Sequence, residues 1–163
     1  MAMRLVVCSL KTGGPQRIPP DEYTILRFPF NAESHDPDDL HPALQPDTGQ
    51  TVTSADDRAG LIWPKHTAWA TLNALIYWEA GGYTEVRDRF VRNPLNLPGA
   101  PPYDSTCTED HPKTPGGQYL AKTWNLFVHP LTPLGLLLQH DAPGPVAVTL
   151  AEFKLSYWVD VPE

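Results

Sequence analysis

The segment from His35 to His41, HDPDDLH, gathers the side chains of this sequence that are best suited to binding a metal ion. Carboxylates are preferred ligands of calcium and magnesium, and imidazoles are preferred by zinc and other transition ions. The candidate metal ligands are therefore His35, Asp36, Asp38, Asp39 and His41.

The spacing of these residues matches no ion-binding motif. The segment lacks the alternating ligands and the glycine of a calcium-binding helical loop. Pro37 also prevents the two histidines from sharing one helix face. A polar turn, in which aspartate side chains accept hydrogen bonds from backbone amides, is the simpler interpretation. We therefore expect a turn rather than a metal site, and no cofactor.

The other histidines stand on separate segments. They are His66, His111, His129 and His140. Only the fold could bring them together, as in a metal-dependent enzyme of the cupin type, which stays an alternative. No single expected strand carries two histidines and a nearby carboxylate, so each is more simply a surface or core histidine.

Other catalytic patterns are missing from the sequence. No serine lies in a Gly-x-Ser-x-Gly turn, and no glycine pattern for phosphates or dinucleotides occurs. Glu109 and Asp110 are adjacent acids in an expected loop. Cys8 and Cys107 fit no metal or redox spacing, so we expect free thiols, with a single bridge as the alternative. These observations disfavour an enzyme.

Composition indicates one domain with a hydrophobic core. The chain has 163 residues, of which 41% are hydrophobic, and its 19 acidic and 12 basic residues give a net charge of −7. No basic stripe offers a surface for nucleic acid. No apolar run approaches the roughly 20 residues that span a bilayer, and the N-terminus lacks the apolar stretch of a secretory signal. We expect a protein made in the cytosol that binds neither nucleic acid nor membrane.

Alternation of apolar and polar residues predicts strands. Residues 149–161 alternate clearly, with Trp158 as the one aromatic residue on the polar side. Residues 66–80 fit a strand better than the alternative helix, and residues 83–92 would pair with them in a hairpin around Gly81 and Gly82. Further strands are expected at residues 23–30, 60–63, 119–128 and 134–140.

Prolines and glycines separate these segments, because 19 prolines break helices and punctuate short strands. Six to eight strands without a long helix favour an antiparallel sandwich or barrel over residues 21–163. Residues 1–20 form an apolar arm and a linker. This arm would either add an edge strand or reach a neighbouring subunit.

Tryptophan supplies a second candidate for binding. Trp63, Trp69, Trp124 and Trp158 could present their rings to a carbohydrate. Large aromatic residues are more commonly buried in a core or at a subunit interface. A glycan-binding module stays an alternative to a structural subunit.

The order of these segments resembles that of phage virion proteins with a tumour-necrosis-factor-like or complement-head-like jelly roll. The resemblance covers residues 23–161 and rests on RFPF, the acidic loop NAESHDPDDLHPA, TVTS, AGLIWP, TAWATLNALIYWEAGGY and TEVRDRFVRN, and on TWNLFVHPLTPLGLLLQHD and VTLAEFKLSYWVDV near the C-terminus. It implies an all-β, antiparallel jelly-roll sandwich with an extended N-terminal arm, and a short strand at residues 51–54.

The same resemblance implies a function. Such a chain would be a capsid decoration protein or a minor component of a phage head or tail, located in the virion after synthesis in the cytoplasm of the bacterial host. Its partners would be itself, as a homotrimer, and the major capsid protein or other virion proteins, with a host surface glycan as the alternative. The interface candidates are Leu5, Val6, Val7, Trp69, Tyr77 and Trp158.

Overall fold

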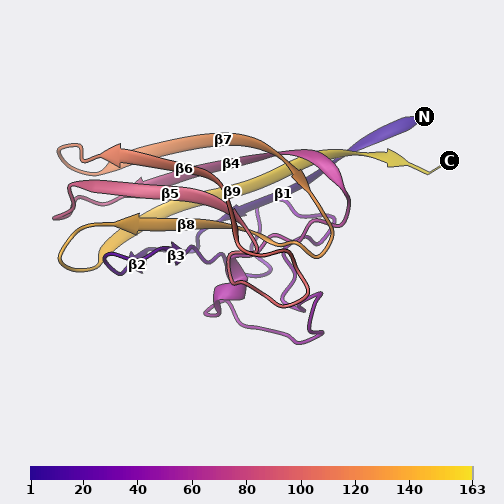
Figure 1. Cartoon of the computed structure of the whole chain (residues 1–163), viewed down its shortest axis with the longest axis horizontal. Helices are drawn as coiled ribbons and strands as arrows, with labels where there is room; N and C mark the ends of the chain where they lie inside the picture. The colour runs from indigo at the N-terminus through magenta and orange to yellow at the C-terminus, as the bar shows by residue number, and fades with distance from the viewer. Residues whose placement is uncertain (163) are drawn as a thin grey trace.

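Two antiparallel sheets stack face to face in the structure, a computed structural model that describes residues 1–162 (Figure 1). The first sheet has the order β1-β9-β4-β7, and the short strand β2 also pairs with β9. Its strands are β1 (Ala2–Lys11), β2 (Gln16–Ile18), β4 (Ala68–Trp78), β7 (Gln118–Val128) and β9 (Val146–Val161). The second sheet has the order β3-β8-β5-β6. Its strands are β3 (Thr24–Ile25), β5 (Glu85–Arg92), β6 (Asp104–Pro112) and β8 (Leu134–His140).

Helical structure is confined, within residues 1–162, to a short 3-10 turn, η1 (Asp57–Gly60). In this part of the chain no helix has the length and apolar character needed to cross a membrane.

The core lies between the sheets, where the apolar sides of the alternating strands meet. In β9 the side chains of Phe153, Leu155 and Tyr157 point inward and are buried, as the alternation predicts. The ring centroid of Phe153 lies 6.1 Å from that of Phe28 and 5.9 Å from that of Phe90 in β5. Each large side chain buried in this way contributes about 1.5–3 kcal/mol relative to an exposed one. These packed rings therefore help to hold the two sheets together.

Residues 66–80 contain the strand β4, which confirms the strand and excludes the alternative helix. The hairpin expected around Gly81 and Gly82 is wrong. β4 pairs with β7 and β9 in the first sheet, whereas β5 pairs with β6 and β8 in the second. Both strands present one apolar side to the same core, so their alternation does not distinguish a hairpin from a connection between the sheets.

Three other expected strands are shorter than predicted or reduced to single bridges. From residues 23–30 only the two residues of β3 form a strand, although Leu26 and Phe28 are still buried. Within residues 51–54 and 60–63, the structure has isolated bridges at Thr51 and Ile62. Apolar side chains in these loops fill the core without a continuous ladder of backbone hydrogen bonds.

Strand β6 was not predicted. Two of its residues, Glu109 and Asp110, were expected in a loop, but the strand pairs with β5 over most of its length. β6 is an edge strand with many exposed positions, so it shows little of the apolar alternation that identifies a half-buried strand.

The N-terminal segment is part of the sandwich. β1 pairs with β9 from Ala2 to Lys11, and Val6, Cys8 and Leu10 point into the core. Of the two alternatives for the arm, the structure shows the edge strand. Within residues 1–20, β1 and β2 both pair with β9.

Candidate subunit interface

One row of apolar side chains crosses all four long strands of the first sheet on its outer face. Leu5 of β1 pairs in register with Trp158 of β9, and Trp69 of β4 pairs with Phe127 of β7. The ladder between β4 and β9 extends to the residues next to Trp69 and Trp158, which places these two tryptophans opposite each other. We call Leu5, Trp158, Trp69 and Phe127 the aromatic row.

The aromatic row is open to solvent in the single chain. Its exposed fractions are 45% for Leu5, 57% for Trp158, 58% for Trp69 and 54% for Phe127. The rings of Trp69 and Phe127 meet edge to face, with centroids 4.9 Å apart. Contiguous exposed apolar surface of this kind marks an interaction site, and tryptophan and phenylalanine are enriched at the cores of protein interfaces.

Beyond the aromatic row the same face becomes polar. Thr71 donates a hydrogen bond to Asn125 at 2.9 Å, and Thr123 donates one to Asn73 at 2.7 Å, both between β4 and β7. In each pair the hydroxyl of the threonine and the amide oxygen of the asparagine form a hydrogen bond within the sheet. On β4 and β7 these polar pairs therefore separate the aromatic row from a second aromatic pair on the same face, Tyr77 and Tyr119.

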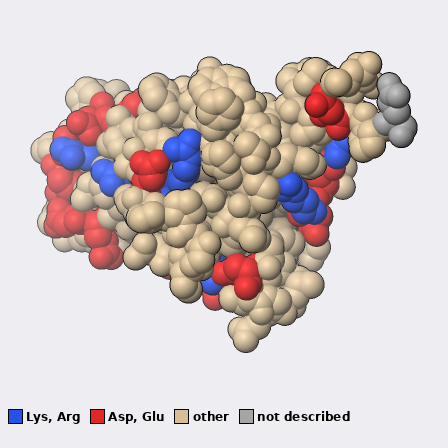
Figure 2. Space-filling model, turned by 45° about the vertical axis from the view of Figure 1, so that its right-hand side comes forward, with Lys and Arg blue, Asp and Glu red and all other residues tan. Residues whose placement is uncertain are grey.

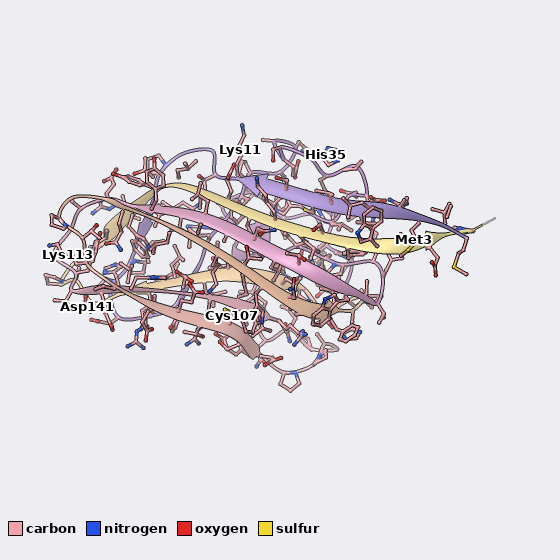
Figure 3. The ribbon with its side chains drawn as sticks, turned by 90° about the horizontal axis from the view of Figure 1, so that it is seen from above. Met3, Lys11, His35, Cys107, Lys113 and Asp141 are labelled. Carbon is pink, nitrogen blue, oxygen red and sulfur yellow. The ribbon has the colours of Figure 1, made fainter. Side chains whose placement is uncertain are left out.

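Figure 3 looks onto this sheet and shows β1, β9, β4 and β7 side by side. Met3, near the start of β1, lies beside the end of β9, and Met3 is also largely exposed. In Figure 2, acidic side chains gather at the end of the molecule opposite the C-terminus. The aromatic row belongs to the half of the sheet that contains the two chain termini, away from this acidic end.

The predicted interface residues divide into three groups. Leu5, Trp69 and Trp158 belong to the aromatic row. Val7 and Tyr77 are half-buried on the same outer face, and Tyr77 packs on Tyr119 with ring centroids 4.5 Å apart. Val6 is a correction: its side chain is buried in the core, because neighbouring residues of a strand point to opposite faces. Phe127 was missed, although it alternates with the inward residues of its strand.

The HDPDDLH segment is a turn that its aspartates hold in place. The carboxylate of Asp36 accepts hydrogen bonds from the backbone amides of Leu40 and His41, both at 2.9 Å. Asp38 pairs with Arg4 of β1 at 2.8 Å. The contacts of Asp36 confirm a polar turn in which an aspartate accepts hydrogen bonds from backbone amides.

Among residues 1–162, the five candidate ligands of this turn do not bring three ligand atoms close together. His41 is buried and stacks on Phe30, with its Nδ1 atom 2.7 Å from Glu33 and its Nε2 atom 2.7 Å from the carbonyl of Ala59. His35 and Asp39 are exposed. Both ring nitrogens of His41 are thus engaged by acceptors of the protein itself.

The remaining histidines also lie apart. His66 contacts the hydroxyl of Tyr157 at 3.2 Å, and the exposed His129 lies 3.5 Å from Thr67. The buried His140 lies 2.7 Å from the carbonyl of Ile18. His111 lies on β6, where it contacts Asp88. These four histidines do not converge, so they do not form the cupin-type centre considered from the sequence.

Both cysteines are free thiols, as expected. Cys8 is buried in β1, and burial raises the pKa of its thiol well above the ordinary value. Cys107 is half-buried on β6, and burial raises the pKa of its thiol as well. A raised pKa leaves little of the reactive thiolate at neutral pH, so neither residue has the properties of a catalytic nucleophile.

Comparison with known proteins identifies the fold. Eiger TNF from S. frugiperda is similar, with a TM-score of 0.58 and 14% identity over 100% of this chain and 97% of that chain. Murine APRIL at pH 8.0 gives a TM-score of 0.59 with 7% identity over 94% and 99% of the two chains. The globular domain of zebrafish complement 1qA protein gives 0.53 with 11% identity over 93% and 95%. No protein-family model and no curated protein matches the sequence.

Identities this low show a common fold and nothing further. The chain is an antiparallel jelly-roll β-sandwich of the type found in tumour necrosis factors and complement heads, as the resemblance implied.

Proposed function

We propose that this chain is a non-enzymatic structural subunit that assembles with copies of itself into a homotrimer by burying the aromatic row. The observation that carries this proposal is the continuous line from Leu5 through Trp158 and Trp69 to Phe127, across four strands that come from distant parts of the sequence. Each large aromatic side chain can bury roughly 150–250 Å² at an interface. The similarity in fold supports other copies of this chain as the partners that cover the aromatic row, because the resemblance to this fold implies a homotrimer.

We further propose that the trimer belongs to a phage particle, as a capsid decoration protein or a minor head or tail component. This part rests on the order of segments that resembles phage virion proteins. The uncharged, strand-spanning interface and the acidic surface at the other end agree with a subunit whose work is adhesion. Its further partner would be the major capsid protein or another virion protein, and its location would be the virion.

Self-association is tested by light scattering on the untagged chain in the presence of a chelator. We expect a mass about three times the 18.1 kDa of the single chain. Trp158→Glu and Trp69→Glu should each shift the mass toward that of the monomer, because a buried carboxylate without a partner is unfavourable. Leu44→Glu is the matched control, since Leu44 is 58% exposed in a loop outside the row. A wild-type monomer at high concentration, or row variants that keep the full mass, would contradict the proposal.

The phage assignment is tested separately by mass spectrometry of purified particles from a phage that encodes the chain. Peptides of the chain should be present in stoichiometric amounts after density-gradient purification. Their absence from the particles would reject the virion location and leave the self-association result unaffected.

The exposed tryptophans favour one alternative function, a carbohydrate- or receptor-binding module. Trp69 and Trp158 could stack on sugar rings if they stay uncovered. Trp63 does not belong to such a platform because it is buried, and Trp124 lies on the opposite side of its strand from Phe127. Retention on a glycan column that Trp158→Ala abolishes, with a monomeric wild type, would favour this alternative over the trimer.

A further inference from the structure

Three side chains that can bind a metal ion meet on β5 and β6, at a place that neither the HDPDDLH turn nor the aromatic row includes. Asp88, Glu109 and His111 each offer one ligand atom, and these atoms lie within 4.8 Å of one another. The Nε2 atom of His111 lies 2.8 Å from a carboxylate oxygen of Asp88 and 3.6 Å from one of Glu109.

The strand register brings two carboxylates face to face. Asp88 of β5 pairs directly with Glu109 of β6, and His111 is two residues further along the same side of β6. Like charges at directly opposed positions destabilise a sheet unless something compensates them. A positive charge beside the two carboxylates would therefore stabilise this pair.

Lys122 supplies only part of that balance. Its Nζ atom crosses from β7 of the first sheet and lies 2.6 Å from Asp88 Oδ1, while the other carboxylate oxygen of Asp88 faces His111. Two carboxylates and one ammonium leave one net negative charge while His111 is neutral. This excess lies beside a ring nitrogen that can act as a ligand.

We propose that Asp88, Glu109 and His111 bind a divalent transition-metal ion of the zinc class. Zinc binds imidazole nitrogens and carboxylate oxygens at about 2.0–2.2 Å, so tetrahedral ligand atoms lie about 3.3 Å from one another. The distances of 2.8 Å and 3.6 Å from His111 bracket this separation. Binding requires His111 to carry its proton on Nδ1, so that Nε2 is free to coordinate.

The surroundings of the cluster suit a site with one open coordination position. The side chain of Asp88 is 1% exposed, whereas those of His111 and Glu109 are 20% and 40% exposed. The ion would therefore be anchored from the interior and reached from solvent, with water as the fourth ligand. Lys122 would orient the Asp88 carboxylate, as hydrogen-bond partners outside a metal site commonly do. The imidazole favours zinc, cobalt or nickel over calcium.

Calorimetric titration of the untagged chain with ZnCl₂ tests this site, and Co²⁺ absorption gives an independent readout of tetrahedral geometry. We expect one ion per chain, and we expect His111→Gln and Glu109→Gln to weaken binding at least about tenfold. The site does not depend on self-association, so the Trp158→Glu variant should bind zinc as the wild type does.

Two substitutions serve as matched controls. Asp110→Asn removes the neighbouring carboxylate, which faces the other side of β6 and pairs with Arg87. His129→Gln removes an exposed histidine outside the cluster. Both should leave zinc affinity unchanged. The proposal is rejected if the wild type binds no zinc, if the controls weaken binding as much as the cluster variants do, or if calcium binds as tightly as zinc.

Discussion

Lys122 Nζ lies 2.6 Å from Asp88 Oδ1 inside the sandwich and connects the first sheet to the second. The ammonium also donates a hydrogen bond to the carbonyl of Cys107 at 3.2 Å and lies 4.8 Å from the ring centroid of Phe90. The side chains of both charged residues are almost completely buried. Each charge is therefore stabilised in the interior by the other.

Removing either partner of this pair should destabilise the fold strongly. Lys122→Met and Asp88→Asn should each lower the free energy of unfolding by about 3–5 kcal/mol, because each leaves a buried group without its partner. The double variant Asp88→Asn/Lys122→Met should lose much less than the sum of the single losses. Urea denaturation of the four proteins measures this coupling, and additive losses would show that the two residues act independently.

Substitutions of the two histidines of the HDPDDLH turn should have different effects on stability, because one is buried and the other is exposed to solvent. His41→Ala leaves Glu33 and the carbonyl of Ala59 without their buried partner. This should lower the free energy of unfolding by about 2 kcal/mol or more. His35→Ala, at an exposed position of the same turn, should change it by less than about 0.5 kcal/mol. Thermal unfolding compares the two, and equal effects would contradict this account of the turn.

Much of the fold could be predicted because its long strands have one apolar side. The alternation in residues 149–161 marks β9, including Trp158 as the exposed exception. Alternation gives the side of a strand that is buried, but it does not give the neighbouring strand. This is why residues 83–92 were predicted to pair with β4 and instead belong to the other sheet.

The sites were less predictable because they depend on pairing between strands. The candidate residues of HDPDDLH are close in sequence, and yet Asp36, Asp38 and His41 contact different partners. His35 and Asp39 are exposed. Asp88, Glu109 and His111 come together only through the β5–β6 register, and β6 lacked a recognisable strand pattern. The aromatic row likewise needs the order of four strands, which no local pattern contains.

The ion pair between Asp47 and Arg58 should make stability depend on pH in acid. Arg58 contacts both carboxylate oxygens, at 2.7 and 3.1 Å, and this hydrogen bonding lowers the pKa of Asp47 below its ordinary 3.8. The folded state thus favours the ionised form. The contribution of the ion pair to the free energy of unfolding is present in full above the ordinary pKa of the aspartate. It is lost as the pH falls through the lowered pKa.

Asp47→Asn should therefore lower the free energy of unfolding by about 1 kcal/mol at pH 7, because the two side chains are only 19% and 17% exposed. The difference from wild type should shrink as the pH falls below about 4. Urea titrations at a series of pH values follow this difference, with the exposed Glu22→Gln as control. A difference that stays constant into acid would contradict the ionic origin of the effect.

The two thiols should differ in their rates of alkylation. Cys8 is buried in the core and Cys107 is half-buried on an edge strand. Iodoacetamide should modify Cys107 first, and Cys8 only after unfolding, because reaction requires an accessible thiolate. Mass spectrometry of the native and urea-treated chain reports the order. Modification of Cys8 in the native chain at the rate of Cys107 would mean that β1 separates readily from β9.

Substitutions at inward and outward residues of β1 should have different effects, the first on folding and the second on assembly. Leu10 is buried in the core, so Leu10→Ala should lower the free energy of unfolding by about 2–5 kcal/mol. Leu5 lies in the aromatic row on the opposite side of the strand, so Leu5→Ala should change stability little in a monomeric background and weaken self-association. Denaturation and light scattering on both variants distinguish the two effects. If Leu10→Ala abolished assembly without lowering stability, the interface would lie on the side of β1 that carries Leu10, which would contradict the proposal.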